Sequence, residues 1–140
     1  MKMSCLLVAT LALVAFDASA KKPCEEHYEK NGSYFGGRQF STWDVAPAVT
    51  PADALKRIHA EGVKSGLKVG SMDREAGTVT FEQVASSSGN PVNLPWNVMI
   101  EPEGAGSKIT VAKSTPPGYA TSESFQIKSM CAVIEAASPK

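Results

Sequence analysis

The chain has 140 residues, of which 43% are hydrophobic, and its 14 basic and 14 acidic residues give a formal net charge of zero. No basic stripe or interleaving of aromatic with basic residues is present, so we do not expect binding to nucleic acid. No metal-ligand spacing, phosphate loop or nucleophile motif appears either, so we expect no metal, no cofactor and no catalytic residue.

Residues 1–20 have the features of a cleaved signal peptide. Lys2 supplies the positive charge of the N-terminal region, an apolar run of about a dozen residues follows, and a cleavage site of small residues ends at Ala20. A signal anchor is the alternative, although its apolar run would fall short of the ~20 residues that span a bilayer. Cleavage would release one domain, residues 21–140, into the periplasm or the medium, and no part of it is apolar enough to span a membrane.

Two cysteines remain in the mature chain, Cys24 near its start and Cys131 near its end. An exported chain with two thiols most simply pairs them. A redox pair would need a local motif such as Cys-x-x-Cys, and these two residues are far apart in the sequence. We therefore predict a structural disulfide that fastens both ends of the domain to one fold.

The first part of the mature chain is polar. Residues 22–30 form a charged run that we predict to be irregular or one short helical turn. His27 lies among glutamates in this run, where a solvated surface is favoured over a metal site. Residues 38–45 are rich in β-formers and predict the first strand.

The clearest helix signal begins at Thr50. Thr50 is a good N-cap, Pro51 suits the first helical position, and Gly66 suits the position just beyond the C-cap. At 100° per residue, one face should pack on the sheet, and Gly62 on that face would let helix and sheet approach closely. The predicted packing face carries Leu55, Ile58, His59, Gly62 and Val63.

His59 is the one residue that could serve as a general base. It would need an orienting partner such as Asp44, Asp73 or a serine brought close by the fold. Without one, a histidine on an apolar helix face is a rim residue with a single satisfied hydrogen bond, and this is the interpretation that we favour.

Two hairpins and a final helix are predicted after residue 66. The period of the hydrophobic residues changes from 3.6, typical of a helix, to 2, typical of a strand, at Leu67. The first predicted hairpin runs from there to Val84. Alternation in the second hairpin predicts inward side chains at Leu94, Trp96, Val98, Ile100, Ile109 and Val111. The final helix, residues 122–137, should bury Ile127, Met130, Cys131 and Ile134.

Two polar segments, residues 85–95 and 114–122, are predicted to be long loops at one end of the sheet. Flexible connectors are the plain alternative. If the loops bind a partner, the contact residues would be Asn90, Asn93, Trp96, Pro117 and Tyr119.

The element order β-α-β-β-β-β-α predicts a single α+β two-layer domain. It would have an antiparallel sheet of four to five strands, two helices packed on one face, and the terminal disulfide. In architecture alone this layout resembles small helix-grip and related sheet-plus-helix domains, and no residue or activity is carried over from them.

These features favour a small exported binding or interaction protein without catalytic activity. An inhibitor, an immunity-type protein or an envelope accessory protein would fit, with another protein of the envelope or extracellular space as its partner. The alternative is a small exported enzyme, or a domain that binds an apolar ligand, using a cleft between helix and sheet near His59.

Overall fold

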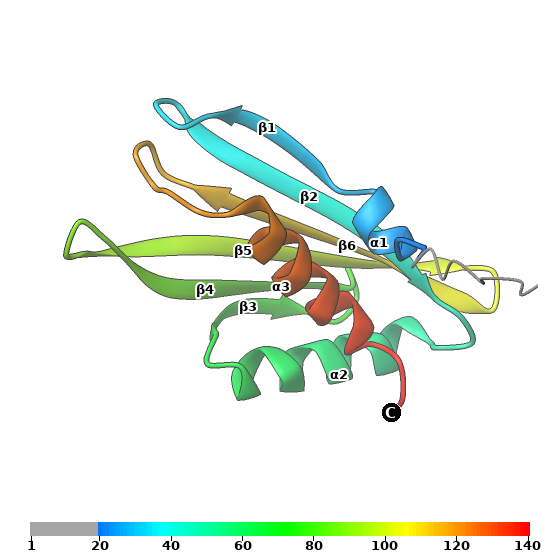
Figure 1. The fold of residues 1–140 in the computed structure, drawn as a ribbon. Coiled ribbons are helices and arrows are strands. Elements are labelled where there is room, and N and C mark those ends of the chain that lie inside the picture. The colour runs from blue at the N-terminus through cyan, green and yellow to red at the C-terminus, as the bar shows by residue number, and fades with distance from the viewer. Residues whose placement is uncertain (1–19) are drawn as a thin grey trace, which may run out of the picture.

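A computed structural model describes residues 20–140, which form an α+β fold of six antiparallel strands and three helices (Figure 1). The helices are α1 (Pro23–Glu26), α2 (Pro51–Lys64) and α3 (Glu123–Glu135). The strands are β1 (Glu29–Ser33), β2 (Gly37–Ala46), β3 (Lys68–Asp73), β4 (Thr78–Ser87), β5 (Asn90–Glu103) and β6 (Gly106–Thr115). The predicted signal peptide lies outside the described residues, apart from Ala20. Within the described range, no helix has the length and apolarity needed to cross a membrane.

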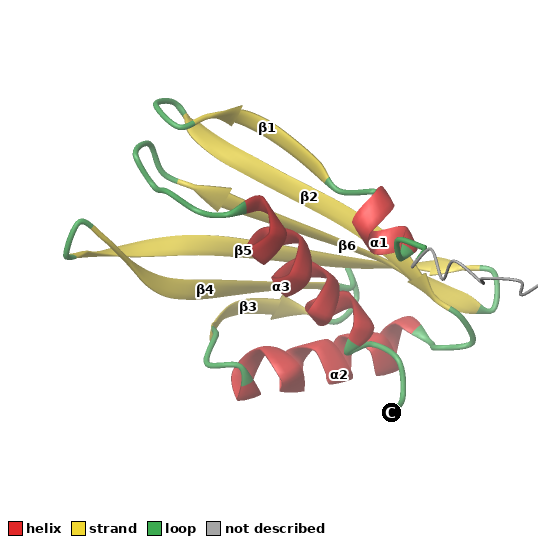
Figure 2. Ribbon diagram, viewed as in Figure 1, coloured by secondary structure: helices red, strands yellow, loops and turns green. Residues whose placement is uncertain are grey.

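The strands follow the order β1-β2-β6-β5-β4-β3, and every neighbouring pair is antiparallel. Figure 2 shows α2 and α3 together on one side of this sheet, as the element order predicted. The predicted sheet of four to five strands was too small. The extra strand is β1, whose five residues carry no apolar side chain and are all exposed. Because an edge strand can be held by backbone pairing with one neighbour, it needs no apolar pattern that a sequence would reveal.

The segment at residues 85–95 is not a long loop, and that prediction was wrong. β4 and β5 continue through it as a hairpin, with Ser87 opposite Asn90. The chain turns at Ser88 and Gly89, whose φ angles are 50° and 81°. Positive φ at both central residues matches the right-handed twist of the flanking strands. At the second predicted loop, β6 extends to Thr115 and leaves only residues 116–122 irregular.

The predicted caps of α2 are confirmed. Thr50 Oγ1 accepts a hydrogen bond from the backbone N–H of Asp53 at 3.2 Å. Gly66 has φ 84°, and Leu67 N donates to Gly62 O at 3.0 Å, which is the bonding pattern of a Schellman motif. The predicted packing face is off by about one position, because Val63 is 52% exposed. The buried residues of α2 are Ala54, Leu55, Ile58 and Gly62.

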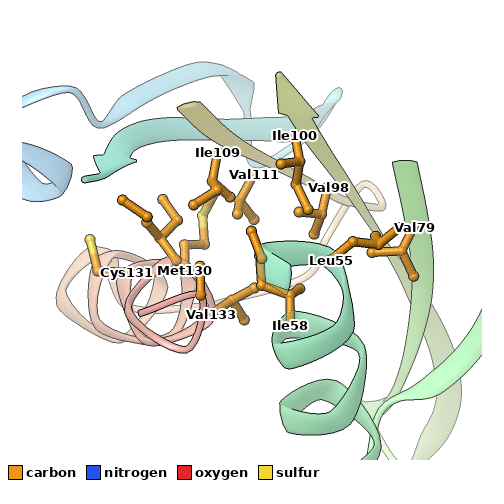
Figure 3. Packing of buried hydrophobic residues seen from close by; sticks show 14 of the residues in the cluster. Leu55, Ile58, Val79, Val98, Ile100, Ile109, Val111, Met130, Cys131 and Val133 are labelled. Carbon is orange, nitrogen blue, oxygen red and sulfur yellow. The ribbon is translucent and has the colours of Figure 1, made fainter. Parts of the chain in front are cut away.

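The core lies between the sheet and the two longer helices. Figure 3 shows Leu55 and Ile58 of α2 and Met130 and Val133 of α3 in one cluster with residues of the central strands. The six inward strand positions predicted from alternation are all buried: Leu94, Trp96, Val98, Ile100, Ile109 and Val111. Of the four positions predicted to be buried in the final helix, Met130, Cys131 and Ile134 are buried and Ile127 is partly buried.

The predicted disulfide is present and joins α1 to α3. Cys24 Sγ and Cys131 Sγ are 2.04 Å apart, and both residues are buried. Thr42 Oγ1 of β2 donates a hydrogen bond to Cys24 O. The short helix α1 is thereby attached to the sheet and to the C-terminal helix, so the bond fastens both ends of the domain, as expected.

His27 is not part of a solvated surface. Its ring stacks on Trp43 with 3.5 Å between the ring centroids, and Nδ1 lies 3.0 Å from Trp43 O. Because β1 pairs only as far as Ser41, this contact covers an edge of β2 that β1 leaves open. Across residues 20–140, no cluster of three or more His, Cys, Asp or Glu side chains could hold a metal ion.

Candidate functional site

His59 lies half-buried on α2 and lines a pocket of about 280 Å³ between α2 and the end of β3. The pocket has an apolar floor that includes Leu55 and Met72, with Lys56 and Arg74 among its lining residues. In the described part of the chain, the imidazole ring of His59 makes no hydrogen bond. The carboxylates suggested as its partners accept from nearby backbone N–H groups instead: Asp44 from Val45, and Asp73 from Glu75 and Ala76.

The predicted loop residues lie in three different settings. Pro117 is exposed and Tyr119 is half-buried in the segment between β6 and α3. Asn90 and Asn93 belong to β5, where both are exposed and Asn93 Nδ2 donates to Glu82 Oε2 at 3.4 Å. Trp96 is 3% exposed and faces the helices, so its placement on a loop surface was wrong.

Connecting segments do gather at one end of the sheet. Figure 1 shows the β1–β2 turn, the β4–β5 turn and the β6–α3 segment at the same end. Two of them are joined, because Gly118 N donates to Tyr34 O at 2.7 Å. The β1–β2 turn carries an aromatic tip, which we define as Tyr34 and Phe35. Their rings meet edge to face at 5.3 Å, and Phe35 is 87% exposed.

A lysine occupies the middle of an aromatic row on the sheet face that the helices cover. Strand register places Lys113 of β6 beside Phe40 of β2 on one side and Trp96 of β5 on the other. Phe81 of β4 follows Trp96 in the same row. All four side chains are buried, and Lys113 is only 1% exposed. Its ammonium does not reach the surface, as the end of a long basic side chain usually does.

The Lys113 ammonium is held by neutral groups. Nζ donates to Gln83 Oε1 at 2.9 Å, and Trp96 Nε1 donates to the same oxygen at 3.1 Å. Nζ also lies 4.6 Å from the centroid of the Trp96 ring and 5.9 Å from that of Phe125. Among the described residues Lys113 forms no ion pair. Burial lowers the pKa of Lys113 to about 8, because an apolar environment disfavours the charged form.

Further buried polar atoms are found in the interior of the fold. Thr115 Oγ1, Gln126 Oε1 and Tyr28 OH have no hydrogen-bond partner in the described structure. Thr115 lies two residues beyond Lys113 on the same face of β6, and Gln126 is buried on α3. Unpaired buried polar groups are unfavourable in a purely structural core, so each one is a candidate for a role beyond packing.

A cleft of about 270 Å³ lies between α2, α3 and the sheet. Lys113 is not among its lining residues, but Gln83, Trp96 and Phe125, the three residues that Nζ contacts, all line it. We call it the Trp96 cleft, and its lining residues are Glu61, Ser65, Leu67, Gln83, Trp96, Phe125, Ser129, Ala132 and Val133.

Sequence reasoning missed Lys113 and Gln83 as site residues, although a signal was present. Lys113 has the same parity as Ile109 and Val111, and Gln83 has the same parity as Phe81. The period of two therefore placed both polar side chains on the buried face. A charged residue at an inward position of an alternating strand therefore indicates a candidate functional site inside the fold.

Comparison with known proteins identifies the fold alone. No protein-family model and no curated protein sequence matches the chain. Among solved structures, that of Ara h 8.0201 superposes with a TM-score of 0.53 at 14% identity, covering 73% of this chain and 95% of the other. A conserved protein of unknown function from Enterococcus faecalis, EF2215, superposes with a TM-score of 0.52 at 8% identity, covering 81% and 76%.

Proposed function

We propose that the protein is a small exported binding protein, and that the Trp96 cleft takes a small molecule with a flat apolar body. The observation that carries the proposal is the pairing of two aromatic side chains from different layers, Trp96 of the sheet and Phe125 of α3, in the lining of one cleft. Aromatic side chains with a few placed polar groups are typical of small-molecule sites.

The size of the cleft limits the ligand. Its volume of about 270 Å³ is just below the usual range for small-molecule sites, roughly 300–1,000 Å³. A molecule of one or two rings would fill it. The amide of Gln83 is the polar group that would orient such a molecule, and its oxygen is held in place by two donors. We assign the site to binding because Gln83, Trp96 and Phe125 offer an amide and two aromatic rings, which hold a ligand without exchanging protons with it, and Glu61 is the one carboxylate in the lining.

Tryptophan fluorescence tests the proposal. The chain has two tryptophans, so a Trp43→Phe variant leaves Trp96 as the only reporter. We expect a neutral two-ring probe, 2-naphthamide, to change Trp96 emission with a saturating titration curve. An Ala132→Leu substitution would fill the cleft and abolish the change, whereas Ala60→Leu, at an exposed position of α2 outside the cleft, would not. A linear, non-saturating response, or one unaffected by Ala132→Leu, would contradict the proposal.

Docking of another protein is a second candidate function, which the aromatic tip favours. Phe35 is 87% exposed and lies on the β1–β2 turn. A hydrogen bond joins this turn to the segment between β6 and α3, so the ring presents an apolar anchor in a fixed position. Anchors of this kind insert into pockets of a partner protein. Pro117 and Tyr119, predicted as contact residues, belong to the loop that the turn contacts.

Capture from an envelope or culture extract tests this second candidate. We expect the mature protein to retain a near-stoichiometric protein partner, and Phe35→Ser to lose it. Val84→Ser is the matched control, because Val84 is 69% exposed on β4, away from the tip. Equal loss with both variants, or no partner with the wild type, would count against docking through the tip.

A further inference from the structure

We infer that the ligand of the Trp96 cleft is an aromatic carboxylate, whose anionic group binds the Lys113 ammonium while its ring lies beside Trp96 and Phe125. This inference rests on the proposed small-molecule binding in the cleft. It goes further by naming the chemical class of the ligand and the residue that selects it.

The first argument concerns charge. A lysine ammonium has three N–H donors, and Gln83 Oε1 is the one acceptor that Lys113 contacts in the described structure. That oxygen is already shared with Trp96 Nε1. The other contacts of Nζ are with the rings of Trp96 and Phe125, and an aromatic ring attracts a cation but does not neutralise it. A carboxylate would supply both the missing acceptors and the missing negative charge.

The second argument concerns access. Every side chain that surrounds Nζ within the distances given above also lines the cleft, so a molecule in the cleft reaches the immediate surroundings of the ammonium. Phe125 is the outermost of these side chains. It lies in the first turn of α3 and is 51% exposed. A rotation of this ring away from Lys113 would open the path for a carboxylate, while Trp96 stays fixed by its hydrogen bond to Gln83.

The third argument concerns orientation. Glu61 is the one carboxylate among the residues that line the cleft, and it belongs to the α2 wall. Lys113 belongs to β6, behind the sheet side of the cleft. An anionic ligand is therefore attracted toward the sheet and repelled from the α2 wall. This arrangement selects a ligand with a single carboxylate directed inward, and it disfavours a second negative charge at the outer end.

A matched pair of probes tests the inference. We expect 2-naphthoate to bind the wild type about 10- to 100-fold more tightly than its neutral isostere 2-naphthamide, as measured by calorimetry at pH 7. Lys113→Met should remove this preference while binding of the amide is retained. Glu61→Gln should leave the preference unchanged or increase it, since it removes the opposing charge.

The outcomes separate this inference from the proposal on which it rests. Equal binding of acid and amide to the wild type would overturn the inference and leave binding in the cleft standing. Binding of neither probe would overturn both. If Lys113→Met does not fold, the ¹³Cε resonance of Lys113 in the wild type decides: a shift with naphthoate and not with naphthamide supports the inference, and no shift with naphthoate overturns it.

Discussion

The ring of Phe81 on β4 lies against the backbone of Gly62 on α2. A β-carbon added at Gly62 would come within 2.4 Å of Phe81 Cε1 and 2.6 Å of Cζ, closer than any ordinary contact. The absence of a side chain at this one helical position therefore sets how closely α2 approaches the sheet. It also affects the Trp96 cleft, because Glu61 and Ser65 on the same part of α2 form one of its walls.

Gly62→Ala should therefore destabilise the protein. Helix propensity alone would make the alanine more stable by about 1 kcal/mol. The overlap with the Phe81 ring opposes this, and we expect a net loss of about 1–3 kcal/mol in the free energy of unfolding, measured by urea denaturation. The double variant Gly62→Ala/Phe81→Leu should regain part of the loss. An alanine variant more stable than the wild type would show that the ring moves aside at no cost.

Removal of the disulfide should weaken the whole domain. Because the bond closes a loop between positions 107 residues apart, we expect Cys24→Ser/Cys131→Ser to lose about 3–5 kcal/mol in the free energy of unfolding. A reductant should lower the stability of the wild type and leave the double variant unchanged. If the predicted signal peptide is cleaved, Cys24 and Cys131 are the remaining cysteines, and reaction of the mature wild-type protein with a thiol reagent, in denaturant without reductant, would show that the bond does not form.

Replacement of Lys113 should stabilise the unliganded protein. Lys113→Met removes a buried charge without an ion-pair partner and keeps a side chain of similar length, while Gln83 Oε1 still accepts from Trp96. We expect a gain of roughly 1–3 kcal/mol near pH 7, by analogy with the replacement of other buried charges by apolar residues. Lys108→Met is the control on the same strand, at a less buried position. A destabilised Lys113→Met would mean that packing around the ammonium outweighs the burial of its charge.

The same lysine predicts how stability depends on pH. Its pKa is about 8 in the fold and near 10.5 when unfolded, so between these values the unfolded chain binds a proton that the folded chain has released. Stability should therefore rise with pH from about 8 upward, by at most about 1.4 kcal/mol per pH unit, relative to Lys113→Met. Below pH 8 the fold carries the full cost of the buried charge.

Tyr28 limits the range of this measurement. Burial raises the pKa of Tyr28 to about 12, above its usual value of 10.0. Between pH 10 and 12 the folded chain retains a proton that the unfolded chain has lost, so this group lowers stability as the pH rises. Tyr28 is present in both wild type and Lys113→Met, so its contribution cancels in their difference, and the stability of the wild type alone shows the Lys113 effect most directly between pH 8 and 10. Parallel curves for the two proteins in that range would contradict the lowered pKa of Lys113.

Much of the fold was predictable because its signals are local. The caps of α2 depend on Thr50 and Gly66, which act on backbone groups a few residues away. The inward residues of β5 follow from alternation within one strand. The disulfide followed from the two cysteines that remain after the predicted signal peptide, without any knowledge of geometry. None of these inferences required knowing which strand lies beside which.

The predictions that failed depended on pairing between distant segments. Residues 85–95 have the composition of a loop, yet they form strands because their backbones pair across the hairpin, from Ala85 opposite Val92 to Ser87 opposite Asn90. β1 exists for the same reason. Trp96 was assigned both to the core and to a partner surface, and only its burial beneath the helices decided between them. Composition describes side chains, whereas strand pairing is made by the backbone.

By itself, the sequence determined the fold class, the ends of the main helix, the inward faces of the strands and the covalent link between the termini. Only the tertiary structure decided that Lys113 lies between Phe40 and Trp96, shares Gln83 with the indole, and lies close to Phe125 of α3. The reason is physical. Periodicity predicts which face of a strand a side chain occupies, but strand order and register determine which residues it contacts there. Strand order and register depend on contacts between segments that are far apart in the chain.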